Sequence, residues 1–173
     1  MSIEKDGTLY REWTLWYLIP DRYTMKEAAW KDFLHPIADF DTIDKFWAAF
    51  NSIEKASLLP KGCRYYVFRK GILPLWEDHA NISGHEVSIE HTIAKAKKPK
   101  VNDRWEDVLF SVIGESFPYS DKINGVEFTV RTETFKIGVW VSQTPYEVTN
   151  AISAELAKLI RWNTPVKVSE IKI

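Results

Sequence analysis

The sequence predicts an α+β fold in which a curved antiparallel β-sheet carries three α-helices on its convex face. Segments that alternate apolar and polar residues, as strands do, are interspersed with segments that repeat apolar residues at helical spacing. The predicted order is strand, helix, two strands, helix, two strands, helix, strand, which lacks the regular strand–helix alternation of a parallel doubly wound sheet. With 173 residues, 45% of them hydrophobic, the chain is long enough for one domain with a substantial core.

The chain is predicted to begin with a flexible lead over residues 1–10, followed by one domain over residues 11–173. Residues 12–19 read as a strand that ends at Pro20, and residues 20–29 as a polar loop. A helix is predicted to start near Asp41 and to end before Pro60. Its apolar face is formed by Ile43, Phe46, Trp47 and Phe50. Strands follow over residues 62–69 and 86–93.

In the carboxy-terminal half, a lysine-rich loop at residues 95–100 precedes the second predicted helix. The buried stripe of that helix consists of Trp105, Val108, Leu109, Val112 and Ile113. Phe110 points away from this stripe, so it is expected either under another element or exposed for a partner. Residues 125–131 and 135–141 predict a hairpin. The third helix is predicted from a capping box at Thr144–Glu147, and a last strand covers residues 166–173.

Composition excludes several classes of protein. The formal net charge of −1 argues against a protein that grips long nucleic acids through their phosphates. A single cysteine, Cys63, excludes an intramolecular disulfide and a cysteine-based metal cluster, and it fits a reducing compartment. The first residues lack the apolar core of a signal peptide, and no apolar run approaches ~18 residues. The expected location is therefore cytoplasmic or nuclear.

Motifs of catalysis are absent from the sequence. It contains no P-loop, no GxSxG, no HExxH and no CxxC, and its four histidines are scattered. We therefore predict a binding protein that is not an enzyme and that needs no metal or cofactor. One rival interpretation is kept open, a nucleotide-processing enzyme in which Glu77, Asp78 and Glu86 hold a divalent ion.

The most informative local feature is the sequence Trp76-Glu77-Asp78, which places a large aromatic plane beside a carboxylate. A second tryptophan, Trp30, lies in a polar stretch where burial is not the obvious use for an indole. Two such rings can sandwich a flat base, and a positively charged base gains further from cation–π attraction. A carboxylate can accept hydrogen bonds from the N–H groups of a guanine. These residues therefore predict a site for an alkylated guanine.

Five ordered segments extend this interpretation to a family. They are Trp13–Trp16, Phe40–Trp47, Gly71–Asp78, Ile113–Phe117 and Lys136–Trp140. In these segments the chain resembles translation initiation factor 4E, the messenger RNA cap-binding family, from about Trp13 to Lys172. The resemblance implies that residues 11–173 form a cap-binding domain whose ligand is the 7-methylguanosine cap at the 5′ end of messenger RNA.

The resemblance also implies roles for individual residues. The residues around the cap base would be Trp30, Trp76, Glu77 and Trp140. Arg131 and Lys136 would face the cap's phosphates. The dorsal surface, which in this family receives a helical motif from the scaffold factor 4G or from 4E-binding proteins, would include Ile43 and Trp47, with Gly114 at its edge. Phe110, because it points away from its helix's buried stripe, is predicted to join them in a shared apolar patch for this partner.

The chain also departs from the family pattern. Glu86 and Glu133 stand where basic residues near the phosphates are common, which predicts a weak contribution from the triphosphate. Glu106 stands where an apolar dorsal residue is usual, and the C-terminal loop that closes over the second nucleotide is missing. These departures leave open a second role, that of a divergent member that competes for caps or joins an alternative scaffold.

Overall fold

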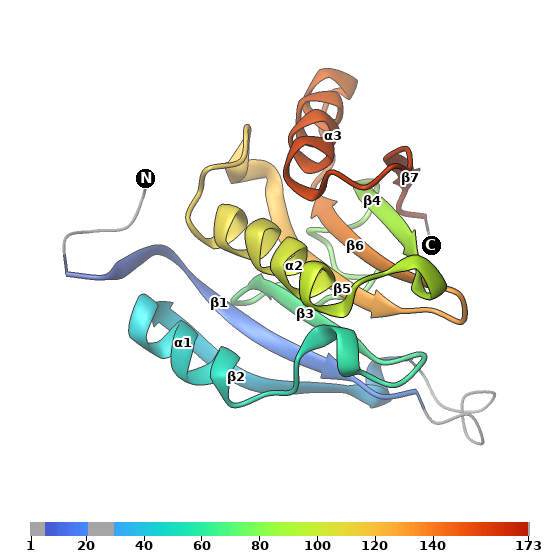
Figure 1. Ribbon diagram of the computed structural model, residues 1–173. Helices are drawn as coiled ribbons and strands as arrows, with labels where there is room; N and C mark the ends of the chain where they lie inside the picture. Colours follow the sequence, from blue (N-terminus) through green and yellow to red (C-terminus); the bar gives the residue numbers. More distant parts are fainter. Residues whose placement is uncertain (1–5, 21–29, 173) are drawn as a thin grey trace.

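The computed structural model describes residues 6–20 and 30–172, and within them seven strands form one antiparallel sheet (Figure 1). The strand order across the sheet is β2-β1-β3-β5-β6-β4-β7. The strands are β1 Thr8–Leu18, β2 Leu34–Thr42, β3 Arg64–Arg69, β4 His85–Thr92, β5 Ile123–Val130, β6 Thr134–Val141 and β7 Lys167–Glu170. The helices are α1 Ile43–Asn51, α2 Lys98–Ile113 and α3 Tyr146–Ile160. The predicted fold class is confirmed.

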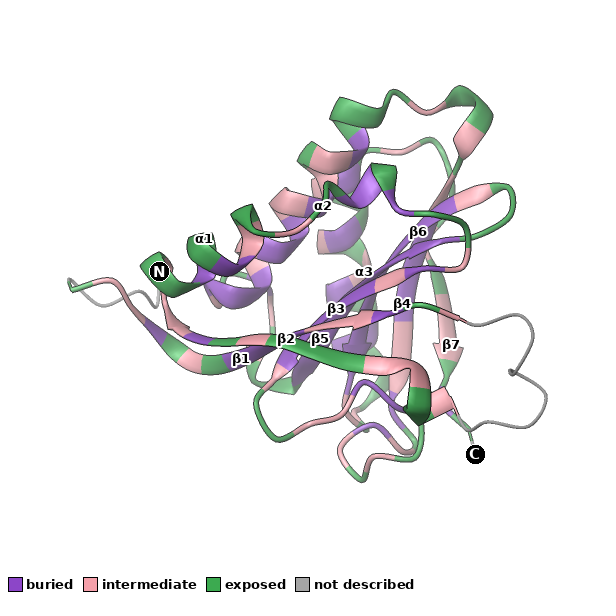
Figure 2. Ribbon diagram, turned by 90° about the horizontal axis from the view of Figure 1, so that it is seen from below, coloured by how far each residue is buried: buried purple, intermediate pink, exposed green. Residues whose placement is uncertain are grey.

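All three helices cover the same face of the sheet, the convex one, and leave the other face without a helical layer (Figures 1 and 2). Between the helices and the sheet lies the main core, to which β3, β5 and β6 contribute every second side chain. The predicted stripe of α2 is confirmed, because all five of its residues are buried, and Trp105 packs 5.6 Å from the ring of Phe128 on β5. The alternate side chains of these strands point to the uncovered face.

Strand β2 was not predicted from the sequence. It lies at the edge of the sheet and pairs only with β1 among the described strands. Most of its side chains are exposed or half-buried, so the alternation of a buried strand is weak, and it contains Pro36, which an edge strand tolerates because one side needs no ladder hydrogen bonds. β1 begins at Thr8, inside the range predicted as a flexible lead, and Thr8 pairs with Thr42.

The helix boundaries differ from the predictions in two places. α1 starts close to the predicted position, and Thr42 caps it, since its hydroxyl accepts a hydrogen bond from the backbone N–H of Lys45 at 3.2 Å. The capping box predicted for α3 is wrong, because the helix starts one residue later, Pro145 takes the cap position and no side chain caps the helix. α2 starts at Lys98, within the predicted lysine-rich loop, since Pro99 is well suited to a first helical turn.

Candidate functional site

A cavity of about 370 Å³ lies on the sheet face opposite the helices. It is lined by Trp30, Arg64, Tyr66, Pro74, Leu75, Trp76, Glu77 and Trp140. The structure therefore brings together the four residues predicted to surround a base, although they come from three separate parts of the chain. Two of them, Trp76 and Glu77, are exposed at its rim, and Trp140 is buried beneath.

The pairing of strands β3, β5 and β6 positions the residue that forms the floor of this cavity, Trp140. Phe68 on β3, Gly125 on β5 and Trp140 on β6 are consecutive partners across the sheet and share its uncovered face. Gly125 is required there, because a Cβ at this position would lie 2.3 Å from the Phe68 ring. The ring of Phe68 therefore lies over the glycine and meets Trp140 edge-on, with centroids 5.3 Å apart. Trp140 is only 2% exposed, so it forms a fixed floor.

Trp30 forms one wall of the cavity, at the start of a short 3-10 helix, η1 (Trp30–Phe33). The guanidinium carbon of Arg64 lies 4.9 Å from the centroid of its ring, which is cation–π distance. A positive group thus already rests on this indole, the same attraction that an alkylated guanine would use. Residues 21–29, which include Arg22 and Lys26 of the loop before Trp30, lie outside the described residues.

The loop that carries Trp76 and Glu77 is held by hydrogen bonds to three polar side chains, of which Asn81 and Asn124 are buried and Asp78 is half-buried. The carboxylate of Asp78 accepts two backbone N–H hydrogen bonds within the loop, each 2.9 Å long. Asn81 is fully buried and donates to two loop carbonyls at 2.9 and 2.8 Å, while Asn124 on β5 donates to the side chain of Asn81 at 3.0 Å. Trp76 is 58% exposed and yet sits on a fixed loop, which reduces the ordering cost of binding a ligand.

This loop network leads to a prediction for Asn81→Ala. The substitution leaves two buried carbonyl groups without their donor, so we expect the free energy of unfolding to fall by about 1–3 kcal/mol. Urea unfolding followed by tryptophan fluorescence measures this change. His79→Ala, in the same loop but exposed, is the matched control and should leave the unfolding midpoint unchanged. Equal stability of the two variants would mean that the network does not hold the loop.

The two predicted phosphate-binding cations have different environments. Arg131 is exposed and forms an ion pair with Glu90 at 2.8 Å. Together with Lys61, Arg64 and Trp30 it lines an open hollow of about 520 Å³, called here the Arg131 hollow. Lys136 is buried, and its ammonium group lies 2.5 Å from a carboxylate oxygen of Glu86 and 2.6 Å from one of Glu127. Lys136 thus lines neither the cavity nor the Arg131 hollow.

A network of four charges lies beneath the site, on neighbouring strands. Arg64 on β3, Glu127 on β5, Lys136 on β6 and Glu86 on β4 all face the uncovered side of the sheet. Gly138 makes room for the two carboxylates, since a Cβ there would lie 3.2 Å from atoms of both. Glu133, the other acid predicted near the phosphates, is exposed in the turn between β5 and β6 and takes no part in the network.

The pKa values of the network's side chains follow from their burial and from the charges of their neighbours. Burial and the neighbouring Glu127 raise the pKa of Glu86 to about 7, although Lys136 acts in the opposite direction. Burial also opposes the charge of Glu127, but Lys136 and Arg64 outweigh it and hold the pKa of Glu127 below its ordinary value. For Lys136 the two carboxylates overcome burial and raise the pKa. Lys136 is therefore charged but neutralised by its neighbours.

The raised pKa of Glu86 predicts a pH dependence of stability. Its folded-state pKa of about 7 exceeds the ordinary glutamate pKa of 4.5, so the folded protein retains a proton that the unfolded chain has lost. The free energy of unfolding should therefore fall as the pH rises from about 4.5 to about 7. Glu86→Gln should remove this part of the slope in urea unfolding, whereas Glu90→Gln, on the same strand, should keep it. A slope that survives Glu86→Gln would assign it to another group.

Sequence reasoning missed Arg64, Tyr66 and Glu127. A signal for the first two was present, because Arg64 and Tyr66 are two residues apart in a strand and so must share a face. No local signal existed for Glu127, whose strand is buried along its whole length. A buried acid becomes interpretable only when its partners on other strands are known.

An aromatic patch on the helical face contains the predicted dorsal residues. Trp47 on α1 is 39% exposed, and its ring centroid lies 5.4 Å from that of Phe110 on α2. Phe110 also meets Phe46 edge-on at 5.9 Å, which explains its position away from the α2 stripe. Ile43 lies one turn before Trp47 and packs on the core. We call Ile43, Trp47 and Phe110 the aromatic patch.

Gly114 borders this patch at the end of α2, where its backbone N–H donates to the carbonyl of Phe110 at 2.9 Å. A Cβ at this position would lie 2.8 Å from the same carbonyl oxygen. Glu106, farther back on α2, lies 3.8 Å from Lys55 and is thus partly neutralised. The patch and the cavity lie on opposite faces of the sheet, so two ligands can occupy them independently.

The three acids of the rival enzymatic interpretation are not arranged as a metal site. The oxygens of Asp78 bind backbone N–H groups, Glu86 is paired with Lys136, and Glu77 is exposed at the cavity rim. Across residues 6–20 and 30–172, no three His, Cys, Asp or Glu side chains form a group that could hold a metal ion. No helix in the described parts of the chain is long and apolar enough to cross a membrane.

Comparisons with known proteins match nearly the whole chain. A family model described as Eukaryotic initiation factor 4E matches residues 8–169. Eukaryotic translation initiation factor 4E of Candida albicans is 32% identical over 161 residues, which are 92% of this chain and 76% of that protein. Among the first matched relatives, the chain spans between 49% and 76% of their own length.

Two solved structures of relatives are similar to this one. Ascaris suum initiation factor 4E-3, in complex with the m7G cap, has a TM-score of 0.86 and 30% identity, covering 95% of this chain and 91% of that chain. Caenorhabditis elegans initiation factor 4E-3, in complex with the 4E-binding protein Mextli and a cap analogue, has a TM-score of 0.83 and 29% identity, covering 94% and 91%.

Proposed function

The chain belongs to the eukaryotic initiation factor 4E family, and from that premise we propose that it binds the 7-methylguanosine cap of messenger RNA and links it to translation initiation through a 4G-like scaffold. The observation that carries the proposal is the cavity in which Trp30, Trp76, Glu77 and Trp140 converge. The bound cap in the Ascaris suum relative supports it. A role in initiation would place the protein in the cytoplasm.

In the proposed mode of binding, the methylated guanine lies between the indoles of Trp30 and Trp76. Its positive charge favours both rings, and the carboxylate of Glu77 accepts hydrogen bonds from the N–H groups of the base. Methylation makes the base cationic, so the same site discriminates against ordinary guanine. Nothing in this scheme requires a chemical step, and we propose that the protein is a binding module without catalytic activity.

The phosphates of the cap would enter the Arg131 hollow, where Lys61, Arg64 and Arg131 supply positive charge. Lys136, which the family resemblance assigns to the phosphates, is withheld by Glu86 and Glu127. Arg131 is partly neutralised by Glu90 as well. Each added phosphate should therefore increase affinity only modestly.

The aromatic patch would receive an amphipathic helix of the scaffold or of a 4E-binding protein, as exposed aromatic residues on a helical face commonly do. The Mextli complex of the Caenorhabditis elegans relative supports this role. The neutralised Lys136 also favours a second candidate function, a divergent member that competes for caps or joins an alternative scaffold. Partners captured from lysate by the wild type but not by a patch variant would separate the two roles.

Quenching of tryptophan fluorescence tests the proposal. We expect 7-methylguanosine triphosphate to quench, and unmethylated guanosine triphosphate to quench far less at equal concentration. The methylated mono-, di- and triphosphates, titrated at low and high salt, should show a small gain per phosphate that salt removes. Equal binding of methylated and unmethylated nucleotides would contradict the proposal. Conversion of the cap analogue in the presence of magnesium would instead support the enzymatic rival.

A further inference from the structure

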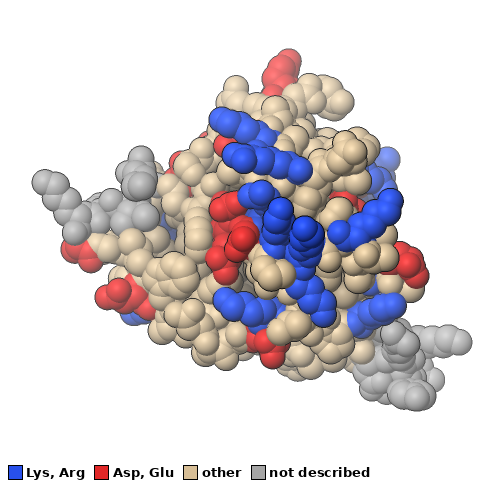
Figure 3. Space-filling model, viewed as in Figure 1, with Lys and Arg blue, Asp and Glu red and all other residues tan. Residues whose placement is uncertain are grey.

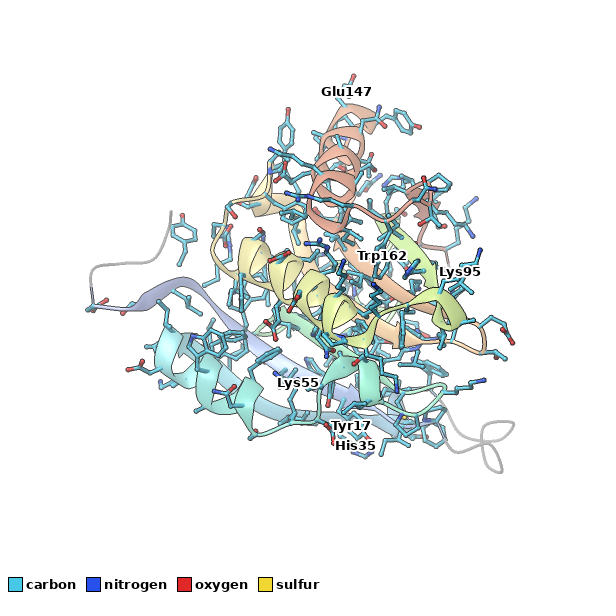
Figure 4. All side chains as sticks on the ribbon, in the orientation of Figure 1. Tyr17, His35, Lys55, Lys95, Glu147 and Trp162 are labelled. Carbon is cyan, nitrogen blue, oxygen red and sulfur yellow. The ribbon has the colours of Figure 1, made fainter. Side chains whose placement is uncertain are left out.

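A second hollow, on the helical face, is lined by basic side chains. Its volume is about 240 Å³, and it lies between the start of α2, the end of α3 and η3 (Ile93–Lys95). We call it the basic groove and define it by Lys95, Lys97, Lys100, Arg104, Arg161 and Trp162. Lys and Arg side chains gather on this face of the molecule (Figure 3), and Lys95 and Trp162 both lie there (Figure 4).

The cations of the basic groove are not neutralised. Lys95, Lys97, Lys100 and Arg161 are exposed and form no ion pair with a described acid, and no acidic side chain lines the groove. Only Arg104 has an acidic partner, Asp107 at 3.2 Å. This differs from the cap site, where Lys136 and Arg131 each have a carboxylate partner. In a chain with a net charge of −1, the groove is a local concentration of free positive charge.

An aromatic plane lies among these cations. Trp162 is half-buried and stacks on His91, with ring centroids 5.1 Å apart and an interplanar angle of 23°. Free cations beside a stacking surface are the combination that binds single-stranded nucleic acid, because the cations follow the phosphates and the ring accepts a base. An acidic peptide would use the cations alone. The aromatic plane therefore favours RNA as the occupant.

The position of the basic groove relative to the cap site agrees with this choice. The backbone N–H of Ile93, in η3, donates to the carbonyl of Glu133 at 2.9 Å and so joins the groove to the turn between β5 and β6. The same turn carries Arg131, which lines the hollow beside Trp30. One short turn thus separates the basic groove from the hollow proposed for the cap phosphates.

We propose that the basic groove binds single-stranded RNA independently of the cap, with its phosphates on Lys95, Lys97 and Lys100 and one base against Trp162. That this RNA is the body of a capped messenger rests on the proposed function. The binding of RNA to the groove itself does not.

The test uses the full chain and three fluorescent probes: an uncapped polyuridine oligonucleotide, the same oligonucleotide with a cap, and polyglutamate. A triple variant, Lys95→Gln, Lys97→Gln and Lys100→Gln, should bind uncapped RNA more weakly. The slope of log affinity against log salt should also fall by about 2, from ~0.7 per lost phosphate contact on a single strand. The control replaces Lys45, Lys55 and Lys122 with Gln, which removes the same charge outside the groove, and should retain wild-type RNA binding.

A second variant tests the base. Trp162→Ala should weaken uncapped RNA binding on the order of tenfold, because a base loses its stacking surface, and Trp162→Phe should restore most of it. Both variants should bind 7-methylguanosine triphosphate as the wild type does, which also shows that they are folded. If the triple lysine variant bound uncapped RNA as tightly as the charge control does, the proposal would be overturned. So would polyglutamate binding as tightly as RNA with no effect of Trp162→Ala, which would indicate a surface for acidic proteins.

The two proposals can fail separately. If the wild type binds uncapped RNA through the basic groove but not 7-methylguanosine triphosphate, the proposed function fails and the groove assignment stands. If the cap analogue binds and the triple variant binds uncapped RNA like the control, the groove assignment fails and the proposed function stands. Capped RNA that binds no tighter than uncapped RNA would mean that the two sites do not act on the same molecule.

Discussion

Trp76→Ala is expected to lower the affinity for 7-methylguanosine triphosphate by about 1–3 kcal/mol, the range for losing an aromatic stacking partner of a base. The effect should be close to a pure binding effect, because Trp76 is 58% exposed and its loop is held by Asp78 and Asn81. Trp30→Ala should have a loss of the same order. Glu77→Gln should also weaken binding, because the base loses a charged acceptor while the shape of the side chain is kept.

Titration of tryptophan fluorescence, with calorimetry for the variants that have lost a fluorophore, measures these losses. Trp47→Ala is the matched control, since it removes another partly exposed tryptophan from the opposite face of the sheet. It should bind the cap analogue as the wild type does. Wild-type affinity in the Trp30, Trp76 and Glu77 variants would end the assignment of the cavity as the cap site.

Trp47→Ala is expected to abolish capture of a scaffold-derived helical peptide. Trp47 is the most exposed member of the aromatic patch, and its ring stands against Phe110 and Phe50 at 5.4 and 6.1 Å. Large aromatic anchors of this kind commonly carry most of the energy of an interface, at about 2 kcal/mol or more each. Trp76→Ala should leave peptide binding unchanged, which makes the two variants reciprocal controls.

Calorimetry with a helical 4E-binding peptide measures this effect, and cap titration of the same protein measures the integrity of the fold. Trp47→Phe should retain part of the peptide binding, because a ring still fills the space beside Phe110. Simultaneous loss of peptide and cap binding in Trp47→Ala would contradict the prediction, since it would indicate a core residue whose removal unfolds the domain.

Long elements with strong local patterns were predictable from the sequence. The α2 stripe, the start of α1 near Asp41 and the pairing of β5 with β6 all depend on residues close together in the chain. Strand β2 was missed because an edge strand has one unpaired side and weak alternation, so its stability comes from pairing with β1 and not from its own residues. The false capping box of α3 shows that a one-residue shift in a helix start removes a cap.

The sequence by itself pointed to Trp30, Trp76 and Glu77 as the residues proposed to bind the base, because an indole beside a carboxylate is a local chemical pattern whose use does not depend on distant partners. Only the tertiary structure decided the state of the phosphate side. There Lys136 meets Glu86, fifty positions away in the chain, and Glu127 on a strand buried throughout. A charge acts according to its neighbours in space, and strand pairing chooses those neighbours. For the same reason Lys136 differs from the lysines of the basic groove. The ammonium group of Lys136 is paired with carboxylates, whereas those of the groove lysines have no acidic partner among the described residues and can bind a ligand.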